Sequence, residues 1–173
     1  MTSRLILCAA ALVLVSARTA AAQPAPAFEV SGSYAAMNDA MNEIDFPLGW
    51  VAGAAVRLAG WLSAAGEVGG SYAKESLPGS DVSLHEYTFM AGLRASVRIG
   101  RFTEFGQFLA GTVYTRSTLY DTVTTEQYGA LQPGGGADFR LTSSLAARGE
   151  ADLRMTHIGR QFRFVAALVY TRP

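Results

Sequence analysis

The sequence contains a single cysteine, a single lysine and two histidines among its 173 residues. A chain with only Cys8 forms no internal disulfide, and this cysteine with two histidines does not complete the four-ligand set of a structural zinc site. The 14 Lys and Arg residues balance 14 Asp and Glu residues, so the formal net charge is zero. A neutral chain lacks the electrostatic attraction that draws basic proteins to nucleic acid. We therefore expect no metal, no cofactor and no nucleic acid among the ligands.

Long hydrophobic runs are also absent. The longest, Leu5–Val15, has about half of the roughly twenty residues that a membrane-spanning helix needs. It follows Arg4 and precedes Ala20–Ala22, and this order of positive charge, apolar stretch and small residues is typical of a secretory signal peptide. The pattern predicts export, with cleavage after Ala22. The expected organisation is a signal peptide over 1–22, a short leader over 23–27 and one folded domain over 28–173.

The sequence does contain a strong alternation of apolar and charged residues. In the stretch LAARGEADLRM, Leu145–Met155, small or apolar residues alternate with Arg148, Glu150, Asp152 and Arg154. A period of two places the charges on one face of a β-strand, whereas a helix would spread them around its circumference. The stretch is therefore predicted to be a strand with one hydrocarbon face and one ionic face.

The same alternation divides the chain after residue 27 into eight predicted strands. They are 28–37, 48–58, 62–72, 87–99, 103–115, 128–141, 145–155 and 162–170. In the fifth strand the pattern does not decide which face is which, because apolar residues share one face with Gln107 and the other with Glu104.

The connections between these strands alternate in length. Between the second and third, fourth and fifth, and sixth and seventh strands only two or three residues remain. The other connections are the polar segments 38–45, 74–83, 116–127 and 156–160. This alternation indicates hairpins with tight turns at one end of the fold and longer loops at the other.

Eight antiparallel strands of this kind close into a barrel in one of two ways. The apolar face points inward in a soluble ligand-binding barrel and outward into lipid in an outer-membrane barrel. Aromatic residues near strand ends, among them Trp50, Tyr72 and Tyr170, favour lipid, because aromatic girdles mark membrane interfaces. Short turns and long loops match the periplasmic and extracellular sides of such barrels. The sequence therefore predicts an all-β fold, an eight-stranded antiparallel up-and-down transmembrane β-barrel in the outer membrane.

Two stretches carry a resemblance to a known family. They are LQPGGGADFRL, Leu131–Leu141, which is followed by a Thr/Ser turn, and the closing FVAALVY, Phe164–Tyr170. With them the chain resembles the small, porin-like outer-membrane barrels of the OmpA and OmpX type. The resemblance implies a monomer in the Gram-negative envelope, in contact with outer-membrane lipid and lipopolysaccharide. It also implies that the barrel assembly machinery reads the last strand, although here Thr171–Pro173 follow the final aromatic residue.

If the apolar face contacts lipid, the charged face lines the barrel interior. An eight-stranded barrel is just wide enough for side chains to fill, and buried charges are tolerated only when they are paired or solvated. We therefore expect an interior ionic network and no open pore. Its predicted members are Glu29, Arg57, Glu67, Glu86, Arg94, Arg98, Asp138, Arg140, Arg148, Glu150, Asp152, Arg154 and Arg163.

Three classes of function remain open on the sequence. The first is a structural or surface-interaction protein, because one fold hosts many functions. The second, a narrow channel or porin for small solutes, requires a continuous polar path. The third, an outer-leaflet lipid-modifying enzyme, requires a nucleophile beside a base. Ser83 and His85, with Asp81 beside them, are the candidates, but the motif expected of a lipid A deacylase or palmitoyltransferase is missing, so we expect no catalytic residues.

The glycine-rich PGGG, Pro133–Gly136, is the remaining motif. It lacks the Gly-Lys that follows in a phosphate-binding loop and lies within a strand pattern. The glycines are instead predicted to let the strand bend at a curved barrel wall.

Overall fold

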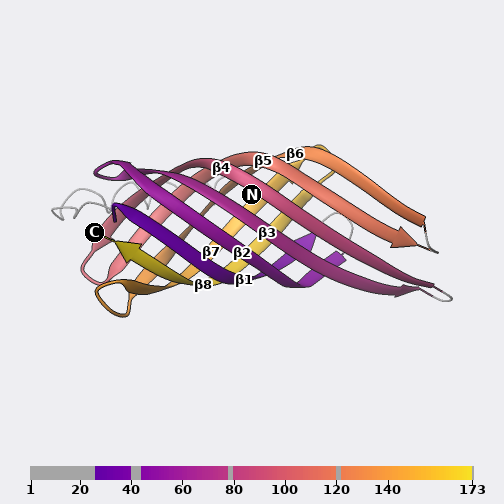
Figure 1. Ribbon diagram of the computed structural model, residues 1–173, viewed down its shortest axis with the longest axis horizontal. Coiled ribbons are helices and arrows are strands. Elements are labelled where there is room, and N and C mark those ends of the chain that lie inside the picture. Colours follow the sequence, from indigo (N-terminus) through magenta and orange to yellow (C-terminus); the bar gives the residue numbers. More distant parts are fainter. Residues whose placement is uncertain (1–25, 40–43, 78–79, 120–121, 173) are drawn as a thin grey trace, which may run out of the picture.

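In the computed structural model the chain forms a closed barrel in which each strand pairs antiparallel with the next and β1 pairs with β8 (Figure 1). The strands are β1 (Phe28–Asp39), β2 (Ile44–Ala59), β3 (Leu62–Leu77), β4 (Ser80–Ile99), β5 (Phe102–Leu119), β6 (Thr122–Arg140), β7 (Leu145–Thr156) and β8 (Arg160–Arg172). The structure describes residues 26–39, 44–77, 80–119 and 122–172. The predicted signal peptide and most of the leader lie outside this range. The predicted fold is confirmed.

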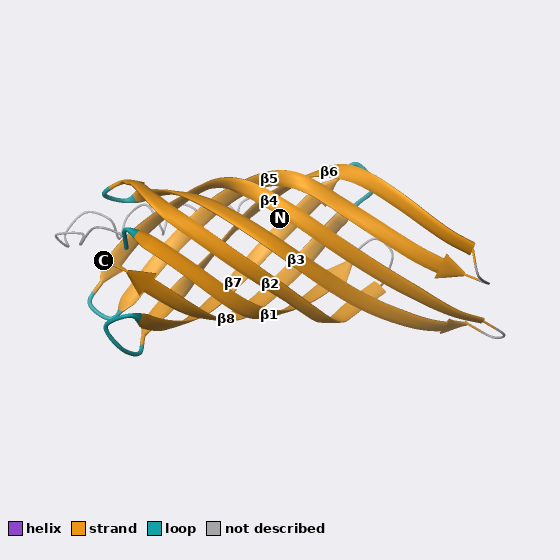
Figure 2. Cartoon of the chain, in the orientation of Figure 1, coloured by secondary structure: helices purple, strands orange, loops and turns teal. Residues whose placement is uncertain are grey.

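The described residues consist of strands and the turns between them (Figure 2). Within this part of the chain, no helix has the length and apolar character to cross a membrane.

The two faces of the barrel wall differ in chemistry, as the alternation predicts. Along β7, buried and more exposed side chains alternate, and the buried set includes Arg148, Glu150, Asp152 and Arg154. Large apolar side chains cover the outside, where Phe164 and Leu168 of β8 are both 62% exposed. Such a surface is stable only against hydrocarbon, since soluble proteins rarely expose apolar patches of this extent.

The faces of β5, which the sequence left undecided, are set by its neighbours. Phe105, Gln107, Leu109 and Val113 are buried inside the barrel, whereas Phe108 is 53% exposed on the outer wall. The register places Gln107 opposite Arg94 of β4. Because a one-residue slip would turn every β5 side chain to the other face, the clear alternation of the flanking strands decides that of β5.

Two of the predicted loops are largely strand, which corrects the sequence analysis. The β3–β4 ladder continues to the pair Leu77 and Ser80, and the β5–β6 ladder continues to Leu119 and Thr122. The alternation is hidden in these segments because they extend beyond the lipid, where both faces of a strand accept polar residues. The longest connections predicted from the sequence are therefore paired hairpins.

The opposite end of the barrel has tight turns. In the β4–β5 turn Gly100 has φ +62°, a left-handed conformation that favours glycine because it has no Cβ. In the β6–β7 turn the hydroxyl oxygen of Thr142 accepts hydrogen bonds from the N–H groups of Ser144 and Leu145. Short turns mark the periplasmic side in this architecture, so the long hairpins point out of the cell.

Candidate functional site in the barrel interior

The first group of interior ion pairs lies toward the end with the short turns. Glu29 of β1 accepts hydrogen bonds from Arg94 and, at 3.0 Å, from Nη2 of Arg148. Arg148 also donates hydrogen bonds to both carboxylate oxygens of Asp138, at 2.6 and 2.9 Å. The guanidinium carbons of Arg94 and Arg148 lie 4.6 and 4.5 Å from the ring centroid of Phe105, within cation–π range. This group connects β1, β4, β5, β6 and β7.

The second group gathers three carboxylates around one arginine. Nη2 of Arg163 lies 2.7 Å from Glu67, 3.2 Å from Glu150 and 2.6 Å from Asp152. The side-chain amide of Gln107 donates to the same three carboxylates, at 3.2, 2.9 and 3.3 Å. Arg163 is 2% exposed. One guanidinium and one amide therefore hold together three acidic groups that would otherwise repel one another.

The third group surrounds Arg154, which is 1% exposed. Its guanidinium forms an ion pair with Glu86 and donates to Gln132 at 3.2 Å and Gln161 at 3.4 Å. The sulfur of Met37 lies 3.4 Å from Nη1. The amide of Gln161 in turn donates to Glu86 at 3.2 Å, so the arginine and its carboxylate share a polar shell.

Glutamine amides join the three groups into one network. The carbonyl oxygen of Gln107 accepts from Arg94 at 2.9 and 2.7 Å, and the Gln132 amide donates to Glu67 at 3.4 Å. Among the described residues, no buried side-chain nitrogen or oxygen lacks a hydrogen-bond partner. A fully satisfied buried network holds its side chains in one arrangement.

The ion pairs of the barrel interior bring together most of the residues that the sequence assigned to it. These are Glu29, Glu67, Glu86, Arg94, Asp138, Arg148, Glu150, Asp152, Arg154 and Arg163. The other three predicted members, Arg57, Arg98 and Arg140, lie near the short turns. Arg57 is half-buried, Arg98 donates to Thr103 at 3.5 Å, and Arg140 donates to the carbonyl oxygen of Gly100 at 3.2 Å in an exposed position.

Sequence reasoning missed the three glutamines Gln107, Gln132 and Gln161, because it selected interior members by charge. Gln132 stood on the charged face of its predicted strand, so a rule that included amides would have found it. Gln107 stood on the strand whose faces were undecided, and Gln161 preceded the last predicted strand. An apolar cluster also lies inside the barrel and includes Leu109 and Val113, both 0% exposed, so the interior is not ionic throughout.

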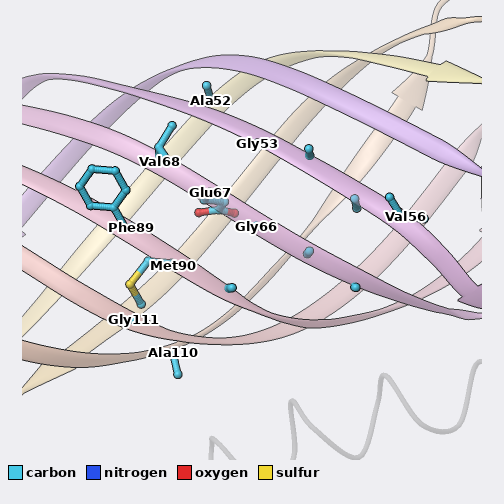
Figure 3. A pocket seen from close by; sticks show the side chains of 15 residues that line it. Ala52, Gly53, Val56, Gly66, Glu67, Val68, Phe89, Met90, Ala110 and Gly111 are labelled. Carbon is cyan, nitrogen blue, oxygen red and sulfur yellow. The ribbon is translucent and has the colours of Figure 1, made fainter.

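The outer wall has a depression of ≈ 790 Å³ across β2, β3, β4 and β5. Figure 3 shows Ala52, Val68 and Phe89 around it, and Glu67 belongs to the buried interior set behind the wall. Small residues form most of the lining, so the hollow suits contact with hydrocarbon chains and offers no catalytic group on the lipid side.

The candidate catalytic pair is not arranged for nucleophilic catalysis. Ser83 and His85 lie on the same face of β4, and no hydrogen bond joins them in the described structure. The ring of His85 instead packs edge-on against Tyr72, with ring centroids 5.3 Å apart. The side chain of Asp81 lies outside the described residues. Within the described part of the chain, no group of three or more potential ligands could hold a metal ion.

Comparison with solved structures identifies the same architecture in other proteins. Ail, the attachment invasion locus protein of Yersinia pestis, aligns with a TM-score of 0.60 at 10% identity over 86% of this chain and 98% of its own. Neisserial surface protein A aligns with a TM-score of 0.63 at 10% identity over 83% and 95%. The N-terminal barrel domain of Pseudomonas aeruginosa OprF gives 0.55 at 9% identity over 86% and 98%. At these identities the likeness concerns the fold alone.

Comparison with curated proteins finds no match. The family model of the outer membrane protein beta-barrel domain, in contrast, matches residues 7–166, which is most of the chain. The protein therefore belongs to the outer membrane protein beta-barrel family and resides in the outer membrane.

Proposed function

We propose that this protein is a closed barrel that conducts no solute and serves a structural or surface-interaction role in the outer membrane. The observation that supports a non-conducting barrel is the connected network in its interior, in which the single residue Arg163 contacts three carboxylates. A solute could pass only if such contacts separated. Leaving a buried charge without its partner typically costs about 3–5 kcal/mol, so an open path that separated these pairs would be rarely populated.

Single-channel recording in a planar lipid bilayer tests this proposal. The purified, refolded protein should insert without stepwise changes in current, whereas a conducting porin in the same bilayer shows that the assay detects pores. Reproducible current steps of one size would contradict the plugged barrel and favour the narrow channel.

The surface role is supported by the long hairpins β3–β4 and β5–β6, which extend beyond the ends of the other strands at the right of Figure 1. A barrel needs only about 9–11 residues per strand to cross a bilayer, whereas β4 has 20 residues and β6 has 19. Two of the structural neighbours are named as an attachment protein and a surface protein. We propose that the barrel anchors these hairpins outside the cell.

The remaining contacts follow from the same picture. We propose that the apolar outer wall binds outer-membrane lipid and lipopolysaccharide, and that the barrel assembly machinery reads the last strand, β8, with its exposed Phe164, Leu168 and Tyr170. We further propose that the protein acts as a monomer and is not an enzyme, since Ser83 and His85 do not form a nucleophile–base pair.

A further inference from the structure

Five arginines lie at the end of the barrel that has the short turns, at the left of Figure 1. They are Arg57 of β2, Arg98 of β4, Arg101 of the β4–β5 turn, Arg140 of β6 and Arg172 of β8. Among the described residues at this end, Glu104 is the one acidic residue outside the interior network. The polar segments 38–45, 74–83 and 116–127, by contrast, contain seven acidic residues and two basic ones. A chain of zero formal net charge therefore has a basic periplasmic end.

Three of these arginines surround one turn. Arg98 pairs with Thr103 across the β4–β5 turn. The N–H of Arg140 donates to the carbonyl oxygen of Arg101 at 2.9 Å, and its Nη2 donates to that of Gly100 at 3.2 Å. Because neighbouring strands lie about 4.8 Å apart, the three residues belong to a patch about 10 Å wide. We call Arg98, Arg101 and Arg140 the arginine cluster.

The arginine cluster has no acidic partner within the described structure. The ion pairs there involve Arg94, Arg148, Arg154 and Arg163. Within the cluster, the guanidinium of Arg98 donates to the hydroxyl of Thr103 at 3.5 Å. Three like charges at one turn repel one another, and each guanidinium has five donors. An anion at this turn would relieve the repulsion and accept the remaining donors.

Exposed aromatic side chains place the arginine cluster at the membrane surface. Phe102 and Phe139 are exposed on the outer wall, with ring centroids 5.2 Å apart. The guanidinium carbon of Arg101 lies 5.6 Å from the ring centroid of Phe139. Trp61, in the adjacent β2–β3 turn, is exposed as well. Aromatic rings gather at the level of the lipid headgroups, so the neighbouring arginines lie at the level of the phosphates in the periplasmic leaflet.

The position of the cluster favours a lipid over a soluble anion as the ligand. The cluster continues the apolar outer wall, on which Phe102 and Phe139 are exposed. A phospholipid is held at this level by its acyl chains on that wall, so its phosphate is already beside the arginines. A soluble anion lacks this second contact and meets the arginines only as screened surface charges. Each basic residue beside a membrane surface favours anionic lipid by a factor of about five.

We propose that the arginine cluster binds the phosphate of anionic phospholipids in the periplasmic leaflet of the outer membrane. The inference rests on the contact between the apolar wall and membrane lipid proposed above. The guanidinium groups donate to the phosphate oxygens, while the acyl chains of the same lipid lie on Phe102 and Phe139. A zwitterionic lipid carries a cationic group beside its phosphate and is attracted less. The β4–β6 side of the barrel therefore selects anionic lipid from the mixture around it.

The chain has a natural fluorescent reporter toward each end of the barrel. Trp61 lies beside β4, because its carbonyl oxygen accepts the N–H of Ser96 at 2.8 Å. Trp50 lies on the outer wall farther from the short turns, where its indole N–H donates to the hydroxyl of Tyr72 at 3.2 Å. Since the chain has two tryptophans, Trp50→Phe isolates the reporter beside the cluster and Trp61→Phe isolates the distant one.

The probe is phosphatidylglycerol brominated near the top of its acyl chains, present as a minor component of phosphatidylcholine vesicles. Bromine quenches nearby tryptophan, and brominated phosphatidylcholine calibrates each reporter. Quenching of Trp61 should indicate a local phosphatidylglycerol fraction about threefold or more above the bulk fraction, whereas quenching of Trp50 should match the bulk. Bulk-level quenching of Trp61, or equal enrichment at both reporters, would overturn the proposal.

Matched variants in the Trp50→Phe background locate the binding. Arg101→Gln combined with Arg140→Gln removes two charges and should bring the quenching of Trp61 to the bulk level. Arg101→Lys combined with Arg140→Lys keeps both charges and should retain most of the enrichment. Arg160→Gln, at the opposite end of the barrel, is the control and should change nothing. Loss of enrichment in the lysine variant or in the control would contradict attraction by the charges of this cluster.

Measurements with the arginine cluster intact make the test independent of whether the glutamine variant folds. Salt at about 1 M shortens the Debye length to about 3 Å and should abolish the enrichment at Trp61, so persistence would refute an electrostatic site. Glycerol phosphate in solution should not displace the lipid, and displacement would identify a soluble anion as the ligand. If brominated phosphatidylcholine quenched neither tryptophan, the lipid contact proposed above would fail. Absence of enrichment alone refutes only this inference.

Discussion

At the scale of single residues, Arg163 should contribute more to the stability of the barrel interior than any one of its three acidic partners. It contacts Glu67, Glu150 and Asp152, so Arg163→Met removes the cation that they share. Truncating one partner of a buried ion pair costs about 3–5 kcal/mol, and we expect a loss of that size in the free energy of unfolding. Urea unfolding in lipid vesicles, followed by tryptophan fluorescence, measures it. The control is Arg160→Met at the exposed start of β8, which should change little.

Neutralising one of the carboxylates around Arg163 should cost less stability than removing the arginine. Glu150→Gln should destabilise far less than Arg163→Met, because the guanidinium keeps Glu67 and Asp152 as partners and one repelling charge is removed. Equal losses for the two variants would contradict a cluster that has more negative than positive charge.

Gly134 shows why an interior glycine matters beyond chain flexibility. A Cβ at this position would overlap the Oδ1 atom of Asp152, and that carboxylate is held by Arg163 at 2.6 Å. Gly134→Ala should therefore cost about 1–3 kcal/mol, the usual penalty of overpacking, in the same unfolding assay. Gly149→Ala is the control, since a Cβ there meets nothing within 4 Å. Equal stability of the two variants would show that the Asp152 side chain has room to move.

At the scale of one strand, β7 has an outer face that must remain apolar. Ala151 lies at the middle of β7, and its side chain is exposed on the lipid side. An arginine near the bilayer midplane of a barrel costs about 2–4 kcal/mol, so Ala151→Arg should lower the stability in lipid vesicles by that amount. Ala151→Leu adds bulk without charge and should be tolerated. If both substitutions were equally harmful, the position would be packed against protein and not lipid.

At the scale of the whole molecule, export precedes barrel assembly. The mature protein should begin at Gln23, because the small residues Ala20–Ala22 suit signal peptidase. Intact-mass measurement of the protein from isolated outer membranes tests this prediction. A mass that includes residues 1–22 would show that the segment is retained.

The sequence by itself determined the eight strands, the two faces of every strand except β5, and the membrane as the surrounding medium. The charges of LAARGEADLRM recur every second residue, which fits a strand with one apolar and one polar face. The aromatic residues near the strand ends and the alternating loop lengths then placed the apolar face against lipid. The same alternation identified most members of the ionic network, because every second residue of a strand lies on the same face. The alternation did not predict the strands in 74–83 and 116–127, because these segments extend beyond the lipid. Both faces of the strand meet water there, so apolar residues no longer mark one face.

Tertiary structure alone decided which charges meet and how far the sheet extends. Arg163 and Glu67 are 96 residues apart in sequence, and their contact depends on closure of the barrel and on the register of every intervening ladder. The faces of β5 and the role of Gln107 were settled by pairing with β4 and β6, since its own pattern was ambiguous. β6 likewise begins at Thr122, farther out than the end of β7 at Thr156, and no single segment encodes this difference in strand length.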